Sequence, residues 1–142
     1  MGTSEFAVPI FCKLLEDYTV SLVVTVPDKP AGRHQKLQQS PVKKAATEAG
    51  IPVSQPTAIK SPEFKAELEA INPDLIVVAS YGKILPPEIL NLPEHGCLNI
   101  HPSLLPKYRG ATPIQSALAN GERKTGTTII LMDQGMDTGD IV

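Results

Sequence analysis

Three polar side chains near the ends of two predicted strands have the types and spacing that acyl transfer needs. Asn99 and His101 are two residues apart at the end of a predicted strand, so both side chains point to the same face. An amide that donates hydrogen bonds, beside a histidine that can carry charge, suits the stabilisation of an oxyanion at a carbonyl carbon. Asp137 follows a different predicted strand, on a loop with Gly135 and Gly139. A carboxylate near the histidine would hold its protonated form and accept protons through water, without a covalent enzyme intermediate.

Each of these features alone also fits a structural role. An Asn or a His near a strand end commonly hydrogen-bonds a loop, and an Asp in a glycine-rich loop is commonly part of a solvated turn. The Gly2-Thr3-Ser4 turn could bind an anion at a helix start, but it also fits a simple helix cap. The chemical interpretation therefore depends on whether the fold brings the three side chains together.

Other chemistries find less support in the sequence. Cys12 and Cys97 are far apart in apolar stretches, so we predict reduced thiols in the core. No His/Cys cluster has the spacing of metal ligands, and we expect no metal. Ser103 is not part of a Gly-x-Ser-x-Gly motif, which excludes a nucleophile elbow. His34 and His95 are predicted to be surface residues.

Composition indicates an ordinary globular domain. The chain has 142 residues, of which 42% are hydrophobic and 20% charged, and its formal charge is −2. This charge disfavours a general electrostatic attraction to nucleic acid, although a local basic patch remains compatible with it. No apolar run approaches the roughly 20 residues needed to span a bilayer, so we expect no membrane association. Residues 1–6 do not resemble a secretory signal, and a cytoplasmic location is the default expectation.

Helix and strand patterns alternate along the chain. The predicted helices run from a Ser4 cap to about Glu16, from a Ser40 cap with Pro41 to just before Gly50, from Ser61-Pro62 onwards, and from Thr112-Pro113 to Gly121. Buried faces are predicted at Phe6, Ile10 and Leu14, and at Phe64, Leu68 and Ile71. The predicted strands are Val20–Val26, a short one around Val53, Asp74–Ala79, Leu98–Ile100 and Thr127–Met132. Segment 27–40 has no periodicity, and such long connections are usually functional or disordered.

This alternation predicts an α/β fold, with a Rossmann-like, mostly parallel sheet covered by helices on both faces. Ligands in such folds bind beyond the carboxyl ends of the strands, which is where Asn99, His101 and Asp137 lie. The chain opens on a turn without a preceding strand and ends on a strand barely begun. We therefore expect residues 1–142 to be one catalytic domain that is truncated at both ends.

Two long sequence blocks resemble a known family. Residues 99–110 (NIHPSLLPKYRG) and 132–140 (MDQGMDTGD) resemble the signature of the 10-formyltetrahydrofolate-dependent formyltransferases, in the same order and with similar spacing. The resemblance covers essentially all 142 residues. It implies the formyltransferase fold, with 10-formyltetrahydrofolate as co-substrate and no metal.

The resemblance also implies roles for individual residues. The catalytic set would be Asn99, His101 and Asp137. The folate would be contacted by Ser103, Leu104, Leu105 and Pro106, with Leu105-Pro106 a candidate cis peptide. The pterin pocket would be walled by Tyr81, Gly82, Lys83, Leu85, Gln134 and Gly135.

One branch of the family is the nearest match. The stretch Val26–Arg33 (VPDKPAGR), followed by Ser40–Lys43 (SPVK), resembles the members that act on initiator methionyl-tRNA, whereas glycinamide ribonucleotide formyltransferases differ in this loop. Arg33, with Lys29 and Lys36, would enter the acceptor stem; the alternative for this loop is a solvated charged flap. Phe6 would touch the methionyl side chain. The branch also implies a C-terminal tRNA-binding domain, which we expect to be absent from residues 1–142, and a monomer.

The implied reaction is direct transfer. The amine of methionyl-tRNA would attack the formyl carbon while Asn99 and His101 stabilise the oxyanion and Asp137 positions His101 and assists proton removal. Two alternatives remain open. The acceptor could instead be glycinamide ribonucleotide or an amino sugar nucleotide, or the chain could be an inactive folate- or tRNA-binding fragment.

Overall fold

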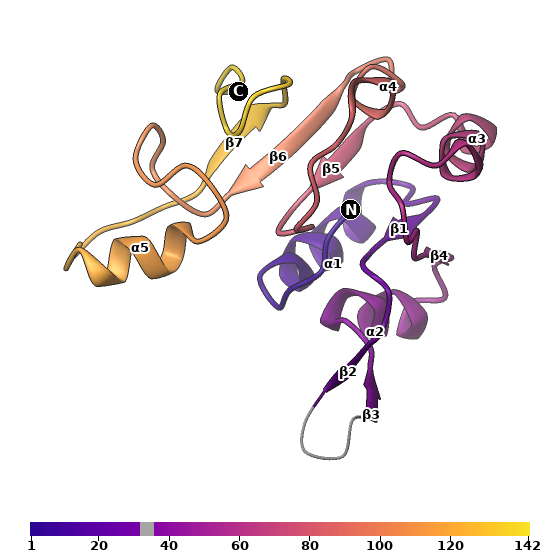
Figure 1. Ribbon diagram of the computed structural model, residues 1–142, viewed down its shortest axis with the longest axis horizontal. Coiled ribbons are helices and arrows are strands. Elements are labelled where there is room, and N and C mark those ends of the chain that lie inside the picture. Colours follow the sequence, from indigo (N-terminus) through magenta and orange to yellow (C-terminus); the bar gives the residue numbers. More distant parts are fainter. Residues whose placement is uncertain (32–35) are drawn as a thin grey trace. The chain divides into compact units, whose positions relative to one another are not determined.

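The computed structural model describes residues 1–31 and 36–142, which form two compact units. Unit 1 comprises Met1–Ile71 and Ala79–Ile84, and unit 2 comprises Asn72–Val78 and Leu85–Val142. Figure 1 shows the elements of both units in sequence colours.

The described residues of unit 1 form three helices and four short strands. Its elements are α1 (Ala7–Asp17), β1 (Val23–Val24), β2 (Lys29–Ala31), β3 (Lys36–Gln38), α2 (Pro41–Glu48), β4 (Val53–Ser54) and α3 (Pro62–Ile71). Strands β1 and β4 pair in parallel, and α2 packs against both of them and against α1. Strands β2 and β3 form an antiparallel hairpin that projects beyond α2 (Figure 1).

Unit 2 is built on a three-stranded sheet. Its elements are β5 (Ile76–Val78), α4 (Pro87–Leu90), β6 (Cys97–His101), α5 (Pro113–Ala119) and β7 (Thr128–Leu131). The strand order is β5-β6-β7, with β5 parallel to β6 and β7 antiparallel to it. The central strand β6 therefore has a neighbour on each side, and this fixes the backbone that carries Asn99 and His101.

The first residues of the chain are hydrogen-bonded within unit 1. Gly2 N donates to Val24 O at 2.9 Å, and Ala79 N donates to Met1 O at 3.0 Å, so Gly2 forms a parallel bridge with Ala79. A Cβ atom on Gly2 would lie 2.8 Å from the Cβ of Ala7 and 3.0 Å from Ala79 O. Only glycine allows this close approach of backbone and helix.

The α/β architecture predicted from the sequence is confirmed. Helix α2 has the predicted cap, because the Ser40 hydroxyl accepts a hydrogen bond from Lys43 N at 3.1 Å, with Pro41 in the first turn and Gly50 (φ +70°) just beyond the end. Helix α3 buries Phe64 and Leu68 as its spacing predicted, whereas Ile71, its last residue, is only half-buried. The predicted β-branched runs contain strands β1, β5 and β7, although each strand is shorter than its run.

Several expectations were wrong. Helix α1 has Phe6 as its N-cap without a side-chain hydrogen bond, so Ser4 does not cap it. Its buried residues are Ala7 and Phe11, one position away from the predicted face, and Cys12 is exposed and not a core thiol. Cys97 is buried as predicted.

Other elements were not predicted from the sequence. The segment after Pro27 contains the β2–β3 hairpin, and α4 is a short helix that no periodicity indicated. Strand β7 is antiparallel to β6, although alternating helices and strands favour parallel pairing.

A polar cluster ties the start of the hairpin to helix α2. Lys43 Nζ donates to Asp28 Oδ2 and to Gln55 Oε1, both at 2.7 Å. Gln55 Nε2 donates in turn to Asp28 Oδ1 at 2.7 Å and to Val26 O at 2.8 Å. The hydrogen bonds from Lys43, and then from Gln55, hold the pKa of Asp28 below its ordinary value of 3.8.

This cluster predicts an acid-dependent contribution to stability. Because the pKa of Asp28 is lowered in the folded state, the contribution is present above the unfolded pKa and is lost as pH falls through the folded pKa. We expect Lys43→Met to lower the free energy of unfolding at neutral pH and to flatten its fall in acid, measured by urea denaturation between about pH 7 and pH 3. The control is Lys44→Met, which removes the same charge from an exposed neighbouring position. Equal effects of the two variants would contradict the assignment.

Candidate active site

Strand β6 presents the two residues that the sequence singled out at its carboxyl end. Asn99 pairs with Val78 on one side and with Ile130 on the other, and His101 pairs with Thr128. The His101 residue is only 4% exposed. Strand pairing therefore fixes the direction of both side chains, on both sides at Asn99 and through β7 at His101.

Asp137 lies on the loop of residues 132–140, which folds back along β7. Leu131 N donates to Asp140 O at 2.8 Å, and Ile141 bridges Ile130, so both ends of the loop are tied to the same strand. A side chain at Gly139 would overlap the Leu131 carbonyl oxygen. This glycine therefore permits the tight return.

Asp133 shapes the same loop from within. Its Oδ1 accepts hydrogen bonds from Gly135 N at 2.9 Å and from the Thr138 hydroxyl at 2.7 Å. Such a side chain–backbone bond two residues on is typical of an Asx turn. The turn fixes the path of the chain on both sides of Asp137.

The structure brings the three predicted catalytic side chains together. Asn99 Nδ2 donates to Asp137 Oδ1 at 3.1 Å, and His101 Nδ1 lies 3.5 Å from the same oxygen. The side chains of His101 and Asp137 are 5% and 11% exposed. An amide and an imidazole thus converge on one carboxylate oxygen in a largely buried position.

The loop of residues 103–110 completes the surroundings of this cluster. His101 Nε2 is 2.9 Å from Tyr108 O, and Gly110 N donates to Asp137 Oδ2 at 2.8 Å. The loop is held by the fully buried Ser103, whose hydroxyl donates to Lys107 O at 2.6 Å. One loop therefore contacts both the imidazole and the carboxylate.

Two of these contacts come from residues with left-handed backbone conformations. Tyr108 has φ +57° and Asp137 has φ +53°. Such conformations are unfavourable for non-glycine residues, persist only where surrounding contacts determine them, and cluster at functional sites. Asp and Asn tolerate the region better than most residues, which agrees with an Asp at position 137.

The hydrogen-bonding partners define the form of His101 that fits this site. A backbone carbonyl only accepts hydrogen bonds, so Nε2 opposite Tyr108 O carries a proton. Asp137 Oδ1, which is also an acceptor, lies 3.5 Å from Nδ1. The site therefore places an imidazole and an amide donor beside one carboxylate, a set of groups that suits stabilisation of a carbonyl oxyanion.

The residues predicted to contact folate belong to both units. In unit 2, Leu104 and Pro106 are exposed, Leu105-Pro106 is a cis peptide as expected, and Leu105 N donates to the Thr128 hydroxyl at 3.1 Å. Gln134 and Gly135 are exposed, and Leu85 is buried. Because Ser103 is fully buried, its side chain serves the loop. The contact of these residues with folate stays a prediction.

In unit 1, Tyr81 is 2% exposed, and burial raises its pKa to about 12. Its backbone carbonyl accepts a hydrogen bond from the Thr3 hydroxyl at 3.0 Å. Gly82 is exposed with φ +79°, and Lys83 Nζ donates to Pro56 O and Thr57 O. The Gly2-Thr3-Ser4 turn is therefore hydrogen-bonded to the segment that begins at Tyr81.

Two of the three basic residues predicted to bind tRNA belong to the strands of the hairpin. Lys29 is exposed on β2, and Lys36 is part of β3. Arg33 and His34 lie outside the described residues. His95 is exposed, as predicted.

Tyr108, Gly110 and Glu122 were not predicted as site residues. Tyr108 and Gly110 act through backbone groups, which residue type does not reveal, although both belong to the block at 99–110. Glu122 accepts hydrogen bonds from Tyr108 and from Lys107, and no motif in the sequence indicated it.

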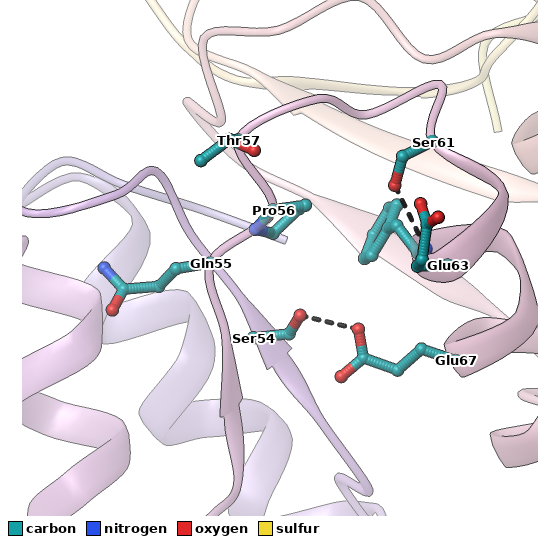
Figure 2. A pocket seen from close by; sticks show the side chains of 8 residues that line it. Ser54, Gln55, Pro56, Thr57, Ser61, Glu63 and Glu67 are labelled. Atoms are coloured by element: carbon teal, nitrogen blue, oxygen red, sulfur yellow. Dashed lines mark hydrogen bonds between the residues drawn. The ribbon is translucent and has the colours of Figure 1, made fainter.

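A shallow, open depression of about 540 Å³ lies elsewhere, in unit 1, between segment 54–57 and helix α3 (Figure 2). The Ser54 hydroxyl donates to Glu67 Oε2 across it at 2.7 Å. It contains none of the predicted catalytic residues.

Among residues 1–31 and 36–142, no group of three or more His, Cys, Asp or Glu side chains could hold a metal ion, and no helix is long and apolar enough to cross a bilayer.

Known proteins resemble this chain along its whole length. A family model described as formyl transferase matches residues 1–142. The chain is 58% identical to a methionyl-tRNA formyltransferase from Caldanaerobacter subterraneus subsp. tengcongensis and 53% identical to one from Clostridioides difficile, in each case over 100% of the chain and 47% and 46% of the relative. It thus spans about half the length of these curated relatives.

A solved structure supports the same fold. The crystal structure of phosphoribosylglycinamide formyltransferase from Bacillus halodurans matches with a TM-score of 0.77 and 27% identity, over 99% of this chain and 74% of that one.

The backbone conformation of Asp137 predicts which substitutions the fold tolerates. Asn accepts the left-handed region and keeps an oxygen for Gly110 N, but it turns an NH2 group toward Asn99 Nδ2 and His101, so Asp137→Asn should cost about 1 kcal/mol of unfolding free energy. Asp137→Val places a β-branched residue there and loses the hydrogen bonds, so it should cost more than about 2 kcal/mol. Urea denaturation measures both.

The matched control is Asn72→Val, at an exposed position with φ +49° and no role in the site. It reports the cost of backbone strain alone and should therefore be less destabilising than Asp137→Val, which also loses hydrogen bonds. Equal stabilities for Asp137→Asn and Asp137→Val would show that the carboxylate is not held in this way.

Proposed function

The chain belongs to the formyl transferase family, and we propose that it is the catalytic part of an enzyme that formylates the free amino group of initiator methionyl-tRNA. The formyl donor is 10-formyltetrahydrofolate. The observation that carries this proposal is the convergence of Asn99 Nδ2 and His101 Nδ1 on one carboxylate oxygen, at 3.1 and 3.5 Å. Two nitrogens that converge on one oxygen are suited to stabilise an oxyanion formed from a formyl group.

In the proposed reaction, the amine nitrogen attacks the formyl carbon and gives a tetrahedral intermediate. Asn99 carries two N–H donors, of which Asp137 uses one, and the other stabilises the oxyanion. His101, in its protonated form, stabilises the same oxyanion. Asp137 holds the imidazolium and accepts the amine proton through water. Cleavage of the bond to the folate nitrogen then releases the formylated amine, and the proton passes to that nitrogen.

The donor side of the proposed site draws on the two loops that hold the catalytic cluster. Leu104 and Met136 are 51% and 58% exposed, so each loop offers an apolar side chain to a flat heterocycle. Leu105, Pro106, Gln134 and Gly135 supply further contacts. Tyr81, Gly82, Lys83 and Leu85 are proposed to complete the pterin pocket.

The choice of methionyl-tRNA as the formyl acceptor is supported by the names of the relatives and by the lysines of strands β2 and β3. The relatives at 53–58% identity are named for methionyl-tRNA, whereas the solved structure named for glycinamide ribonucleotide is 27% identical. Lys29 and Lys36 on the hairpin, together with Arg33, are proposed to contact the acceptor stem, and Phe6 the methionyl side chain. We also propose that the protein acts in the cytoplasm, as a monomer.

Formyl transfer to competing acceptors tests this function. The chain is assayed alone and joined to the remaining C-terminal part of the Caldanaerobacter relative, with 10-formyltetrahydrofolate and either methionyl-tRNA, glycinamide ribonucleotide or an amino sugar nucleotide. We expect transfer to methionyl-tRNA to exceed transfer to the other acceptors by at least about 10²-fold in kcat/KM. Preference for a small amine would overturn the acceptor assignment, and folate binding without any transfer would support the inactive alternative.

The same assay tests the catalytic set. Removing one oxyanion donor typically lowers the rate about 10²–10³-fold, so Asn99→Ala should lose activity on this scale while it still folds. The control is Asn120→Ala, an exposed Asn whose side chain only bonds to Ser116 O. Near-normal turnover of Asn99→Ala would exclude Asn99 as an oxyanion donor.

A further inference from the structure

We propose that Glu122 is a positioning residue for formyl transfer, which acts by holding the Tyr108 side chain so that the Tyr108 carbonyl stays against His101 Nε2. This inference rests on the proposed function for its effect on rate. Its structural part, the control of the His101 ring by Glu122 and Tyr108, stands on unit 2 alone.

The Tyr108 side chain is hydrogen-bonded to Glu122, which lies in a later segment of the chain. The Tyr108 hydroxyl donates to Glu122 Oε1 at 2.9 Å, and Lys107 Nζ lies 2.9 Å from the same oxygen. The Glu122 side chain is 28% exposed, whereas that of Lys107 is 65% exposed. The bonds from Lys107 and then Tyr108 keep the pKa of Glu122 below its ordinary value, so this carboxylate is charged at neutral pH.

The backbone of Glu122 is held at the C-terminal end of helix α5. Helix α5 ends at Ala119, and Gly121 adopts a left-handed conformation with φ +67°. Gly121 N donates to Leu118 O, and Glu122 N donates to Ala117 O, both at 3.0 Å. These two bonds form a Schellman motif, which fixes the first residues after a helix. Glu122 is therefore attached to a defined helix end and not to a free loop.

Tyr108 contacts the candidate active site through its backbone carbonyl. Tyr108 has the unfavourable φ of +57°, so other contacts must hold its backbone. Its hydroxyl is held by Glu122, and Ser103 and Gly110 hold the loop on either side through Lys107 O and Asp137 Oδ2. In this conformation its carbonyl lies 2.9 Å from His101 Nε2.

The consequence concerns the protons of His101. With a carbonyl opposite Nε2, that nitrogen carries a proton, and Nδ1 faces Asp137. If the Tyr108 carbonyl moves away, Nε2 loses its fixed acceptor and the ring can rotate or change tautomer. Glu122 thereby influences catalysis without touching the substrates.

Three variants test this arrangement. Tyr108→Phe removes the hydroxyl and keeps the backbone, Glu122→Gln removes the charge and keeps an acceptor, and Lys107→Met removes the exposed partner of Glu122 alone. Small misplacements of catalytic groups cost up to about 10²-fold, so we expect Tyr108→Phe to lower kcat roughly 10-fold or more, with KM for the folate nearly unchanged. Glu122→Gln should lie between Tyr108→Phe and the parent, and Lys107→Met should match the parent.

A spectroscopic readout separates positioning from general destabilisation. In ¹⁵N-labelled chain, we expect a slowly exchanging His101 Nε2 proton in the parent and in Lys107→Met. That signal should broaden or disappear in Tyr108→Phe, while the backbone spectrum stays folded. If Tyr108→Phe misfolds, Glu122→Gln provides the same comparison. Parent-like imidazole signals in both Tyr108→Phe and Glu122→Gln would overturn the proposal, and this outcome is independent of whether the chain transfers formyl groups.

Discussion

The shared use of the Asp137 carboxylate is the interaction on which the rest of the site depends. Its Oδ1 is bound by the Asn99 amide and lies beside His101, and its Oδ2 accepts from Gly110 N. These groups come from strand β6, from the loop that follows it, and from the return of the chain after β7. Without the carboxylate, the Asn99 amide and the Gly110 N–H would each lose an acceptor in a part-buried position, which is costly inside a protein.

This constraint explains why several local features are placed as they are. Gly139 lets the chain return close to Leu131, Asp133 forms the turn before Asp137, and Ser103 anchors the opposite loop. None of them needs to touch a substrate. Together they fix the two left-handed residues, Tyr108 and Asp137, whose unfavourable backbone conformations are held by their hydrogen bonds. Catalytic geometry of this kind is supported mainly by residues that surround the reacting groups.

The sequence predicted side-chain chemistry better than backbone chemistry. Asn99 and His101 could be placed on one face because strand periodicity is local, and the Ser40-Pro41 start of α2 follows from residue type alone. Tyr108 and Gly110 contribute a carbonyl and an N–H, whose directions depend on conformations set by tertiary contacts. The orientation of β7 and the buried face of α1 depend on packing in the same way. Cys12 was misplaced because Phe11, and not Ile10, is buried against the core.

A double-mutant cycle between Asn99 and Asp137 tests the central claim most directly. Single-turnover formyl transfer is measured for Asn99→Ala, Asp137→Ala and the double variant, all in the chain joined to the C-terminal part of the Caldanaerobacter relative. Residues that act as a unit are strongly non-additive, so the double variant should be no slower than the slower single variant, within about 3-fold. If the two losses multiply, Asn99 and Asp137 act independently, and the carboxylate does not organise the site.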